Sequence, residues 1–291
     1  MEPYENQAAG HQRMEQHTEY PGIIFKPLTK REAAIYSDIT SKHEKLASII
    51  PRFEGVFTVE DGILRKVDEN ELSAIIHAES LKDDQLVPDY YIGLEDLLYG
   101  ISGACVMDFK LGCKQHAFDF PTEKREIQIR KCQMNTSWKH GFRISGLIST
   151  VTPALSKKKD ELSRISMGHT FKLIYQILHE SRNPAKLKPA IISALEHIMS
   201  IFLEQSDYFF ISASLLLIFD VYEQDKVTVK LIDLGRTYSL SELLLQHVDL
   251  RSDINPEAIK FCEKLNCSLK ADCNCIFGLH NLIETFRDVN I

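Results

Sequence analysis

Residues 105–112, CVMDFKLG, place a carboxylate and an ammonium group two positions apart inside an apolar segment. In a β-strand alternate side chains point to one face, so Asp108 and Lys110 share a face and the apolar residues around them share the other. We expect the apolar face to pack and the charged face to meet water or a ligand. Such a carboxylate can orient or deprotonate a nucleophile while the lysine neutralises phosphate charge. The alternative is an ordinary ion pair on a half-exposed strand.

Two further charged positions suit phosphate chemistry. Asp233 ends the β-prone run VTVKLIDLG, and Gly235 two positions later would allow a tight turn. A carboxylate at a strand end is a common magnesium ligand near nucleotide phosphates, although it can equally cap the next turn. Lys26, on an early strand in IIFKPL, is followed by Glu32 in an expected helix, as are the lysine and glutamate that hold nucleotide phosphates in protein kinases.

Basic residues are dense between positions 110 and 131, although the whole chain carries a net charge of −7. Lys124, Gln128 and Lys131 follow helical spacing, so one face of a helix over 122–133 would present two cations and an amide. This face could bind phosphates. Arg125 and Arg130 fall outside the stripe and could be solvated. The alternative for the whole face is an ordinary solvated helix surface.

The elements that must position these residues predict an α+β fold. Strands are expected in GIIFKP, GVFTV, GILRKV, DYYIGLEDLL, CVMDFKLG and FRISGLIST, and as a hairpin in SASLLLIFDVYEQDKVTVKLIDLG. Helices are expected in TKREAAIYSDI with a threonine cap, over 122–133 with a Thr122 cap, over 166–180 and 186–204, and in FGLHNLIETFRDV. The sequence thus predicts a small sheet-rich lobe followed by a larger mixed lobe, without repeats or linkers.

Composition narrows the class of protein. A chain of 291 residues with 44% hydrophobic content can build a substantial core. No apolar run approaches the length of about 18 residues typical of a membrane span, and the first residues lack a signal-peptide core, so we expect an intracellular protein without membrane anchoring. The negative net charge argues against a general nucleic-acid binder.

The seven cysteines are interpreted as thiols, because an odd number in a long chain suits a reducing compartment. Four of them lie between Cys262 and Cys275, but their spacing does not match the short knuckles of structural zinc sites. We therefore expect no zinc.

Taken in order, these segments resemble the inositol polyphosphate kinase family. Its Pro-x-x-x-Asp-x-Lys-x-Gly strand is matched by ACVMDFKLG, with Ala104 in place of proline. AGHQRM resembles the family's Gly-His loop, and KPLTKREAAIY resembles its Lys-Pro-Leu segment. LEDLL resembles the family's adenine hinge. SASLLLIFD resembles its Ser-Ser-Leu-Leu segment, and LIDLG resembles its Ile-Asp-Phe-Ala segment. The segment after Gly112 is compactly spaced and contains the residue pattern RKC…TS, and in both respects it is most similar to inositol hexakisphosphate kinases.

The resemblance implies a bilobal protein-kinase-like fold and ATP- and Mg²⁺-dependent phosphoryl transfer to an inositol polyphosphate. Its N-terminal lobe would span about 7–95 and its C-terminal lobe about 98–291, after a tail at 1–6. The preferred acceptor would be the hexakisphosphate or pentakisphosphate, giving a diphosphoinositol product. The protein would be a monomer of the cytoplasm, the nucleus or both.

The resemblance also implies a role for each site residue. The catalytic residues would be Asp108 and Lys110. ATP would be held by Lys26, which Glu32 positions, and by the hinge residues Glu95, Asp96 and Leu97. Magnesium would bind Asp233 and Ser214, and inositol phosphates would contact Lys110, Lys124, Gln128, Lys131 and Arg236. Arg164 and Ser166 are possible additional contacts.

Departures from the family pattern leave alternatives open. Ala213 replaces the first serine of the Ser-Ser pair, Leu234 and Gly235 replace Phe-Ala, and Arg236 stands where histidine is common. Trisphosphate 3-kinase activity, multikinase activity, and non-catalytic binding of inositol phosphates are the alternatives.

Overall fold

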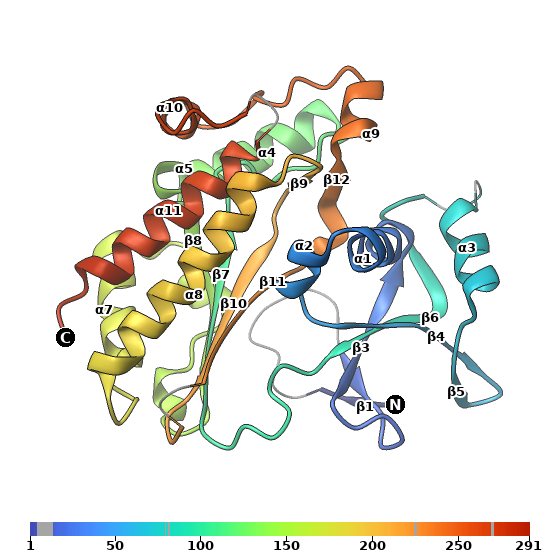
Figure 1. Cartoon of the computed structure of the whole chain (residues 1–291), viewed down its shortest axis with the longest axis horizontal. Coiled ribbons are helices and arrows are strands. Elements are labelled where there is room, and N and C mark those ends of the chain that lie inside the picture. The colour runs from blue at the N-terminus through green and yellow to red at the C-terminus, as the bar shows by residue number, and fades with distance from the viewer. Residues whose placement is uncertain (5–13, 79, 81, 224–225, 269–270) are drawn as a thin grey trace. The chain divides into compact units, whose positions relative to one another are not determined.

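The computed structural model describes residues 1–4, 14–78, 80, 82–223, 226–268 and 271–291. It forms two compact units, Met1–Gly100 and Ile101–Ile291 (Figure 1). The first is rich in sheet and the second mixes helices and strands, so the predicted α+β class is confirmed. Residues 9–13 of the expected Gly-His loop lie outside the described residues.

The first unit is built on a six-stranded antiparallel sheet of order β1-β2-β3-β6-β4-β5. Its strands are β1 (Glu2–Pro3), β2 (Glu15–Gln16), β3 (Ile23–Thr29), β4 (Phe53–Glu60), β5 (Ile63–Lys66) and β6 (Leu86–Glu95). Its helices are α1 (Lys30–Lys42), α2 (Glu44–Ser48) and α3 (Glu69–His77). The β4–β5 hairpin agrees with the sequence interpretation, whereas Glu2–Pro3, expected in a tail, pair with β2.

The start of α1 follows directly from the sequence. Thr29, the last residue of β3, accepts a hydrogen bond from the Glu32 backbone N–H and caps the helix. Because β3 runs straight into α1, Lys26 and Glu32 come from adjoining elements and are close in space.

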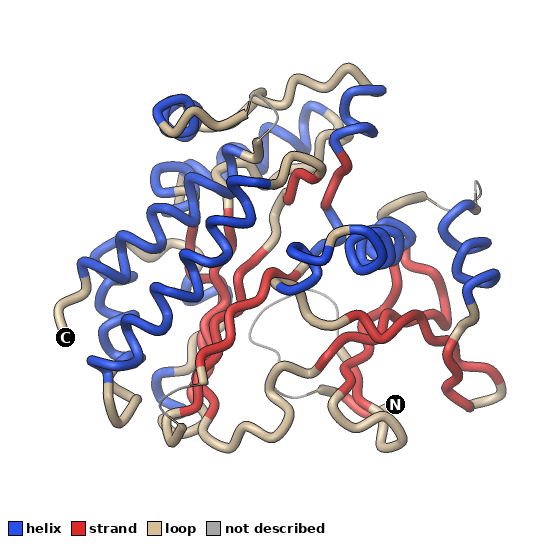
Figure 2. The backbone as a smooth tube through the Cα atoms, viewed as in Figure 1, coloured by secondary structure: helices blue, strands red, loops and turns tan. Residues whose placement is uncertain are grey.

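The second unit is organised around a four-stranded antiparallel sheet of order β11-β10-β7-β8 (Figure 2). Its strands are β7 (Ala104–Leu111), β8 (Phe142–Ser149), β10 (Ser214–Asp220) and β11 (Val227–Ile232). Lys110 lies opposite Ser214 on one side and Arg143 on the other. These three side chains therefore share one face of the sheet.

The opposite face of this sheet is apolar and covered by helices α7 (Met167–Leu178), α8 (Pro184–Glu204) and α11 (Cys273–Asp288). Figure 1 shows α8 and α11 side by side along it. Met107, Phe109 and Leu111 are fully buried, and the Phe109 ring packs edge-on against Phe286 of α11. The packed face fixes the strand that carries Asp108 and Lys110.

Two glycines let α11 approach the end of β7. Gly112 has a φ of 91°, and a Cβ there would lie 2.3 Å from the Asn274 side chain. Asn274 in turn accepts a hydrogen bond from the Lys114 backbone N–H at 2.7 Å. At Gly278 a Cβ would meet the Gly141 carbonyl oxygen at 2.0 Å. The turn after the Asp-x-Lys strand is thus held by the first two turns of α11.

The remaining elements are mostly short. They are α4 (Thr122–Gln133), α5 (Thr136–His140), η1 (Pro153–Leu155), α6 (Lys159–Leu162), β9 (Tyr208–Phe210), η2 (Leu234–Arg236), β12 (Thr237–Ser239), α9 (Leu240–Leu245) and α10 (Pro256–Lys264). The Thr122 cap is wrong: Thr122 is the first helical residue, and Pro121 precedes it without a side-chain cap. Within the described residues no helix is long and apolar enough to cross a membrane.

Candidate functional site

Asp108 is more buried than its pattern predicts, with 3% of its surface exposed. Of the expected contact with water or a ligand, Asp108 therefore does not meet bulk water, and contact with a ligand stays a prediction. A bulge in the β7–β8 pairing after Asp108 brings in Ser145, whose hydroxyl donates to Asp108 Oδ1 at 2.6 Å. Burial raises the pKa of Asp108, and Lys110, Ser145 and Ser214 partly oppose that rise.

Lys110 pairs with Asp233, which lies 123 positions further along the chain. Its Nζ atom lies 3.2 Å from Asp233 Oδ2, and 15% of the lysine side chain is exposed. The alternative of an ordinary Asp108–Lys110 ion pair does not describe this face. Lys110 donates its hydrogen bond to Asp233, and its charge also lowers the pKa of Asp108. Asp108, Lys110 and Asp233 thus form one charged group.

The backbone turns at Asp233 itself. Asp233 has a φ of 65°, whereas the expected turn residue Gly235 is not among the glycines with positive φ. Aspartate is one of the few residues that adopt this left-handed conformation routinely. Its side chain makes no cap hydrogen bond to η2, so the capping alternative is not realised.

Ser214 provides an unsatisfied oxygen beside this group. Its hydroxyl is fully buried and makes no well-formed hydrogen bond to the described residues, although it is close enough to lower the pKa of Asp108. Magnesium prefers such hard oxygen ligands and usually keeps several waters or phosphate oxygens. The Asp233 carboxylate and the Ser214 hydroxyl therefore fit a magnesium ion bound mainly through a nucleotide, and the described residues contain no larger cluster of metal-ligating side chains.

Sequence reasoning missed two cations near Lys110, one on the same sheet face and one in helix α6. Arg143 is opposite Lys110 and donates to Gln115 Oε1 at 2.6 Å and Ser137 Oγ at 3.0 Å. Burial lowers the pKa of Lys159, and the charges of Arg143 and Lys110 lower it further, so the three cations are grouped. Strand alternation in FRISGLIST could have assigned Arg143 to the face of Asp108, whereas Lys159 has no comparable local signal.

At the N-terminal end of α4, the expected substrate residue Lys124 shares an aromatic contact with Arg236, three positions after Asp233. Lys124 Nζ lies 3.8 Å and Arg236 Cζ lies 5.2 Å from the centre of the Phe120 ring. Gln128 is half-buried and Lys131 is exposed, further along α4. Arg125 is partly solvated, with 42% of its side chain exposed, and also pairs with Asp253 of a loop that lies against the helix.

Arg164 and Ser166 have different surroundings. An open pocket of about 470 Å³ is lined by Asp160, Glu161, Ser163, Arg164, Ile165 and His169. Arg164 is therefore available to a ligand. The Ser166 hydroxyl caps α7 and lies 3.0 Å from His169 Nδ1, so it serves the helix.

The first unit holds its own part of the predicted site. Lys26 Nζ lies 2.8 Å from Glu32 Oε1, and Glu32 is buried. Side chains of the hinge are engaged: Glu95 Oε2 accepts from the Arg52 backbone N–H, and Asp96 Oδ1 accepts from Tyr4 Oη and the Leu98 N–H. The backbone N–H groups of Glu95 and Asp96 are engaged as well, by the Arg52 and Gly22 carbonyls. Recognition of a ligand by the hinge would therefore depend on its remaining backbone groups, those of half-buried Leu97 among them.

Comparisons with known proteins agree with this architecture. Inositol hexakisphosphate kinase 1 of Rattus norvegicus is 28% identical over 246 residues, which cover 77% of this chain and 52% of that protein. Inositol hexakisphosphate kinase 3 of Homo sapiens is 34% identical over 214 residues, 68% of this chain and 51% of that protein. The chain spans about half the length of the curated relatives it matches.

Among solved structures, inositol phosphate multikinase Ipk2 of S. cerevisiae, in complex with ADP and Mn²⁺, has a TM-score of 0.64 at 21% identity and covers 91% of this chain and 98% of that one. A second inositol phosphate multikinase structure has a TM-score of 0.56 at 17% identity, covering 89% and 99%. Both share the fold. Residues 91–287 match the sequence profile described as inositol polyphosphate kinase, and the chain therefore belongs to the inositol polyphosphate kinase family.

Proposed function

We propose that the protein is an ATP- and Mg²⁺-dependent kinase that transfers a phosphoryl group to a densely phosphorylated inositol. The observation that carries the proposal is the group formed by buried Asp108 and by Lys110 on one face of the sheet, together with Asp233 directly after strand β11. Phosphoryl transfer depends mainly on positioning and on stabilising negative charge, and this group combines carboxylates with a cation held in place.

Asp108 orients the attacking oxygen and accepts its proton when the acceptor is a ring hydroxyl. Its raised pKa suits a general base better than that of an ordinary surface carboxylate, because the base strength rises with the pKa. A phosphate acceptor is already ionised near neutral pH and needs only orientation. Lys110 would neutralise charge that develops on the transferred group.

Residues for the nucleotide and its metal are proposed one by one. Lys26, oriented by Glu32, would bind ATP phosphates, and the hinge of Glu95, Asp96 and Leu97 would bind adenine through its backbone. Asp233 and Ser214 would hold magnesium. When bound, the metal supplies charge neutralisation at the phosphates.

The acceptor would be bound by a cationic surface on the second unit. We assign this role to Lys110, Lys124, Gln128, Lys131 and Arg236, and add Arg143 and Lys159 because they cluster with Lys110. Each added phosphate can pair with another cation, so inositol hexakisphosphate or pentakisphosphate is the proposed substrate and a diphosphoinositol is the product. Similarity to hexakisphosphate kinases supports this choice.

Multikinase or trisphosphate 3-kinase activity is the second candidate. It is favoured by the similarity of the fold to an inositol phosphate multikinase. We further propose that the protein acts as a monomer, in the cytoplasm, the nucleus or both, without nucleic-acid partners.

Purified protein incubated with labelled ATP and a panel of inositol phosphates tests the proposal. The wild type should give labelled inositol phosphate in large molar excess over enzyme, and Asp233→Asn should give none, because an amide is a poor magnesium ligand. Tight polyanion binding without product would support a non-catalytic sensor instead. Wild-type turnover by Asp233→Asn at ordinary magnesium would contradict the metal assignment.

A further inference from the structure

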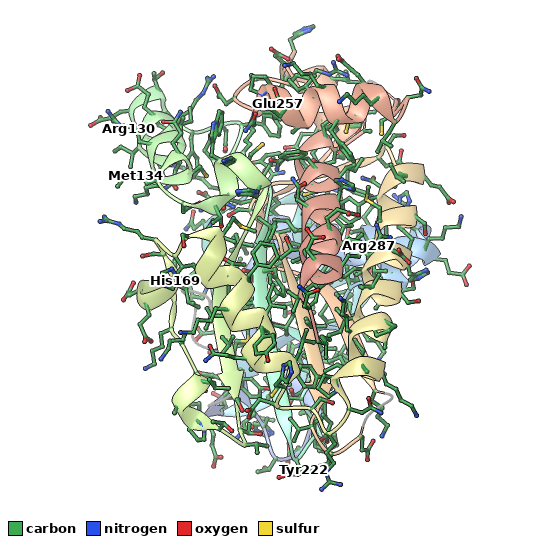
Figure 3. The ribbon with its side chains drawn as sticks, turned by 90° about the vertical axis from the view of Figure 1, so that its left-hand side faces the viewer. Arg130, Met134, His169, Tyr222, Glu257 and Arg287 are labelled. Atoms are coloured by element: carbon green, nitrogen blue, oxygen red, sulfur yellow. The ribbon has the colours of Figure 1, made fainter. Side chains whose placement is uncertain are left out.

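Helix α4, which carries Lys124 and Lys131, is held by very little apolar packing. Of its twelve residues, all of which the structure describes, Cys132 alone is buried. Figure 3 shows Arg130 and Met134, at and just beyond the end of the helix, on the outer edge of the second unit. A polar helix of this length is marginal by itself, so its orientation depends on individual polar contacts.

One carboxylate makes the principal polar contact at the N-terminal end of α4. Arg125 Nε lies 2.5 Å from Asp253 Oδ2, and His116 Nε2 lies 3.2 Å from the same oxygen. His116 is buried in the connection that follows β7. His116 Nε2 makes no well-formed hydrogen bond to the described residues, so Arg125 is the polar partner of Asp253 here and His116 only lies beside it. Asp253 thus lies between the substrate helix and the segment leaving the catalytic strand.

The loop around Asp253 is itself anchored to that segment. Lys114 Nζ donates to the Ser252 carbonyl at 3.0 Å and lies 3.9 Å from the centre of the Phe118 ring. Lys114 is almost completely buried, and burial lowers its pKa to about 8. Because its ammonium group has these partners inside the protein, the loop cannot move away from β7 without leaving a buried cation unpaired.

We propose that Asp253 is a positioning residue that holds α4 through Arg125 and thereby sets the affinity for the inositol phosphate. The proposal rests on the proposed function, since Lys124 and Lys131 are its assigned substrate contacts. Asp253 touches neither of them and acts only through the direction it gives to the helix. Lys131 and Lys124, the two assigned substrate lysines, are thus coupled to a residue 122 and 129 positions further along the chain.

Asp253→Asn is the appropriate variant, because position 253 has a φ of 57° and asparagine tolerates this left-handed conformation as aspartate does. The substitution removes the charge and keeps the side-chain size. Arg125→Gln removes the other partner of the ion pair. Arg130→Gln is the matched control, since it removes one positive charge from the exposed end of the same helix.

Hydrogen exchange of full-length, substrate-free protein tests the anchoring of α4 independently of activity. Exchange in peptides from 122–133 should become about two- to fivefold faster in Asp253→Asn and Arg125→Gln, as expected for loss of a partly exposed ion pair, and the double variant should add little. Arg130→Gln should exchange as the wild type does. Unchanged exchange in both variants would overturn the role of Asp253.

Steady-state kinetics test the consequence for substrate. Both variants should raise the KM for inositol hexakisphosphate about two- to fivefold and leave kcat and the KM for ATP unchanged. A fall in kcat with unchanged KM, or an equal effect of Arg130→Gln, would overturn the positioning role. Absence of turnover in the wild type would defeat the proposed function and the substrate part of this proposal, whereas the exchange result still decides whether Asp253 holds α4.

Discussion

At the scale of single residues, the site consists of charges whose surroundings are set by the fold. Asp108 and Lys110 could be found from strand alternation and a resemblance to a family motif, and their positions on one sheet face agree with that prediction. The burial of Asp108 could not, because it depends on a bulge that brings in Ser145. The pairing of Lys110 with Asp233 joins distant segments and has no local signal.

A residue-scale prediction concerns Glu32. Glu32→Gln should raise the KM for ATP or lower kcat so that kcat/KM for ATP falls about tenfold or more, because Lys26 loses the buried carboxylate that orients it. The KM for the inositol phosphate should change little. Glu60→Gln, which removes an exposed carboxylate at the end of β4 that pairs with Arg65, is the control. Equal kinetics for Glu32→Gln and wild type would refute the role of this pair.

At the scale of elements, the sequence predicted most strands and helices because their apolar periods are clear. The β4–β5 and β10–β11 hairpins and the helix over 122–133 agree with the structure. The environment of α4 was not predictable: helical spacing assigns Arg125 to a face, but Asp253, which pairs with it, lies 128 positions away. The spacing of apolar residues identifies helices and strands, whereas contacts between distant segments decide which charged side chains form ion pairs.

The cationic stripe of α4 leads to a prediction about substrate choice. Replacing Lys124 and Lys131 by alanine should raise the KM for inositol hexakisphosphate about tenfold and that for a trisphosphate much less, since fewer phosphates lose a partner. The effect should diminish at high salt, because exposed charges are screened over about 8 Å at physiological ionic strength. Lys260→Ala with Lys264→Ala on α10 gives the same change in net charge as a control. Equal penalties for all substrates would contradict this role of α4.

The contact of α11 with the segment before β8 leads to a prediction about stability. Gly278→Ala should lower the free energy of unfolding by about 2–4 kcal/mol, because its Cβ would overlap the Gly141 carbonyl oxygen. Gly168→Ala in α7 is the matched control: its Cβ would lie 3.8 Å from Ser166 Oγ, and alanine should stabilise that helix by up to about 1 kcal/mol. Denaturant titrations of both variants provide the comparison; equal stabilities would show that α11 does not pack closely at Gly278.

At the scale of the whole molecule, a buried carboxylate ties the second unit together and makes its stability depend on pH. Asp272 caps α11 and accepts a hydrogen bond from the Phe210 backbone N–H of β9 at 2.8 Å. Burial raises its pKa to about 6. Between pH of about 4 and about 6 the folded protein keeps a proton that the unfolded chain has released, so this group's stabilisation is present below about pH 4 and is lost as pH rises to about 6.

The stability of wild type relative to Asp272→Asn should therefore fall by about 2–3 kcal/mol between pH 4 and pH 6.5, since the amide does not titrate. Chemical denaturation of both proteins across this range measures the difference, in which the contributions of all other titrating groups largely cancel. A difference that is constant with pH, or that grows as pH rises, would contradict the raised pKa.

The central claim is that the charged face of the second unit serves phosphoryl transfer to a densely phosphorylated inositol. It is tested most directly by measuring kcat/KM of the wild type for inositol hexakisphosphate, pentakisphosphate and trisphosphate at physiological salt, with isomer-resolved identification of each product. We predict the highest kcat/KM for the hexakisphosphate or pentakisphosphate and a diphosphoinositol as product. The highest kcat/KM for inositol trisphosphate, with a phosphate added to a free ring hydroxyl, would contradict the account and favour a trisphosphate kinase or multikinase.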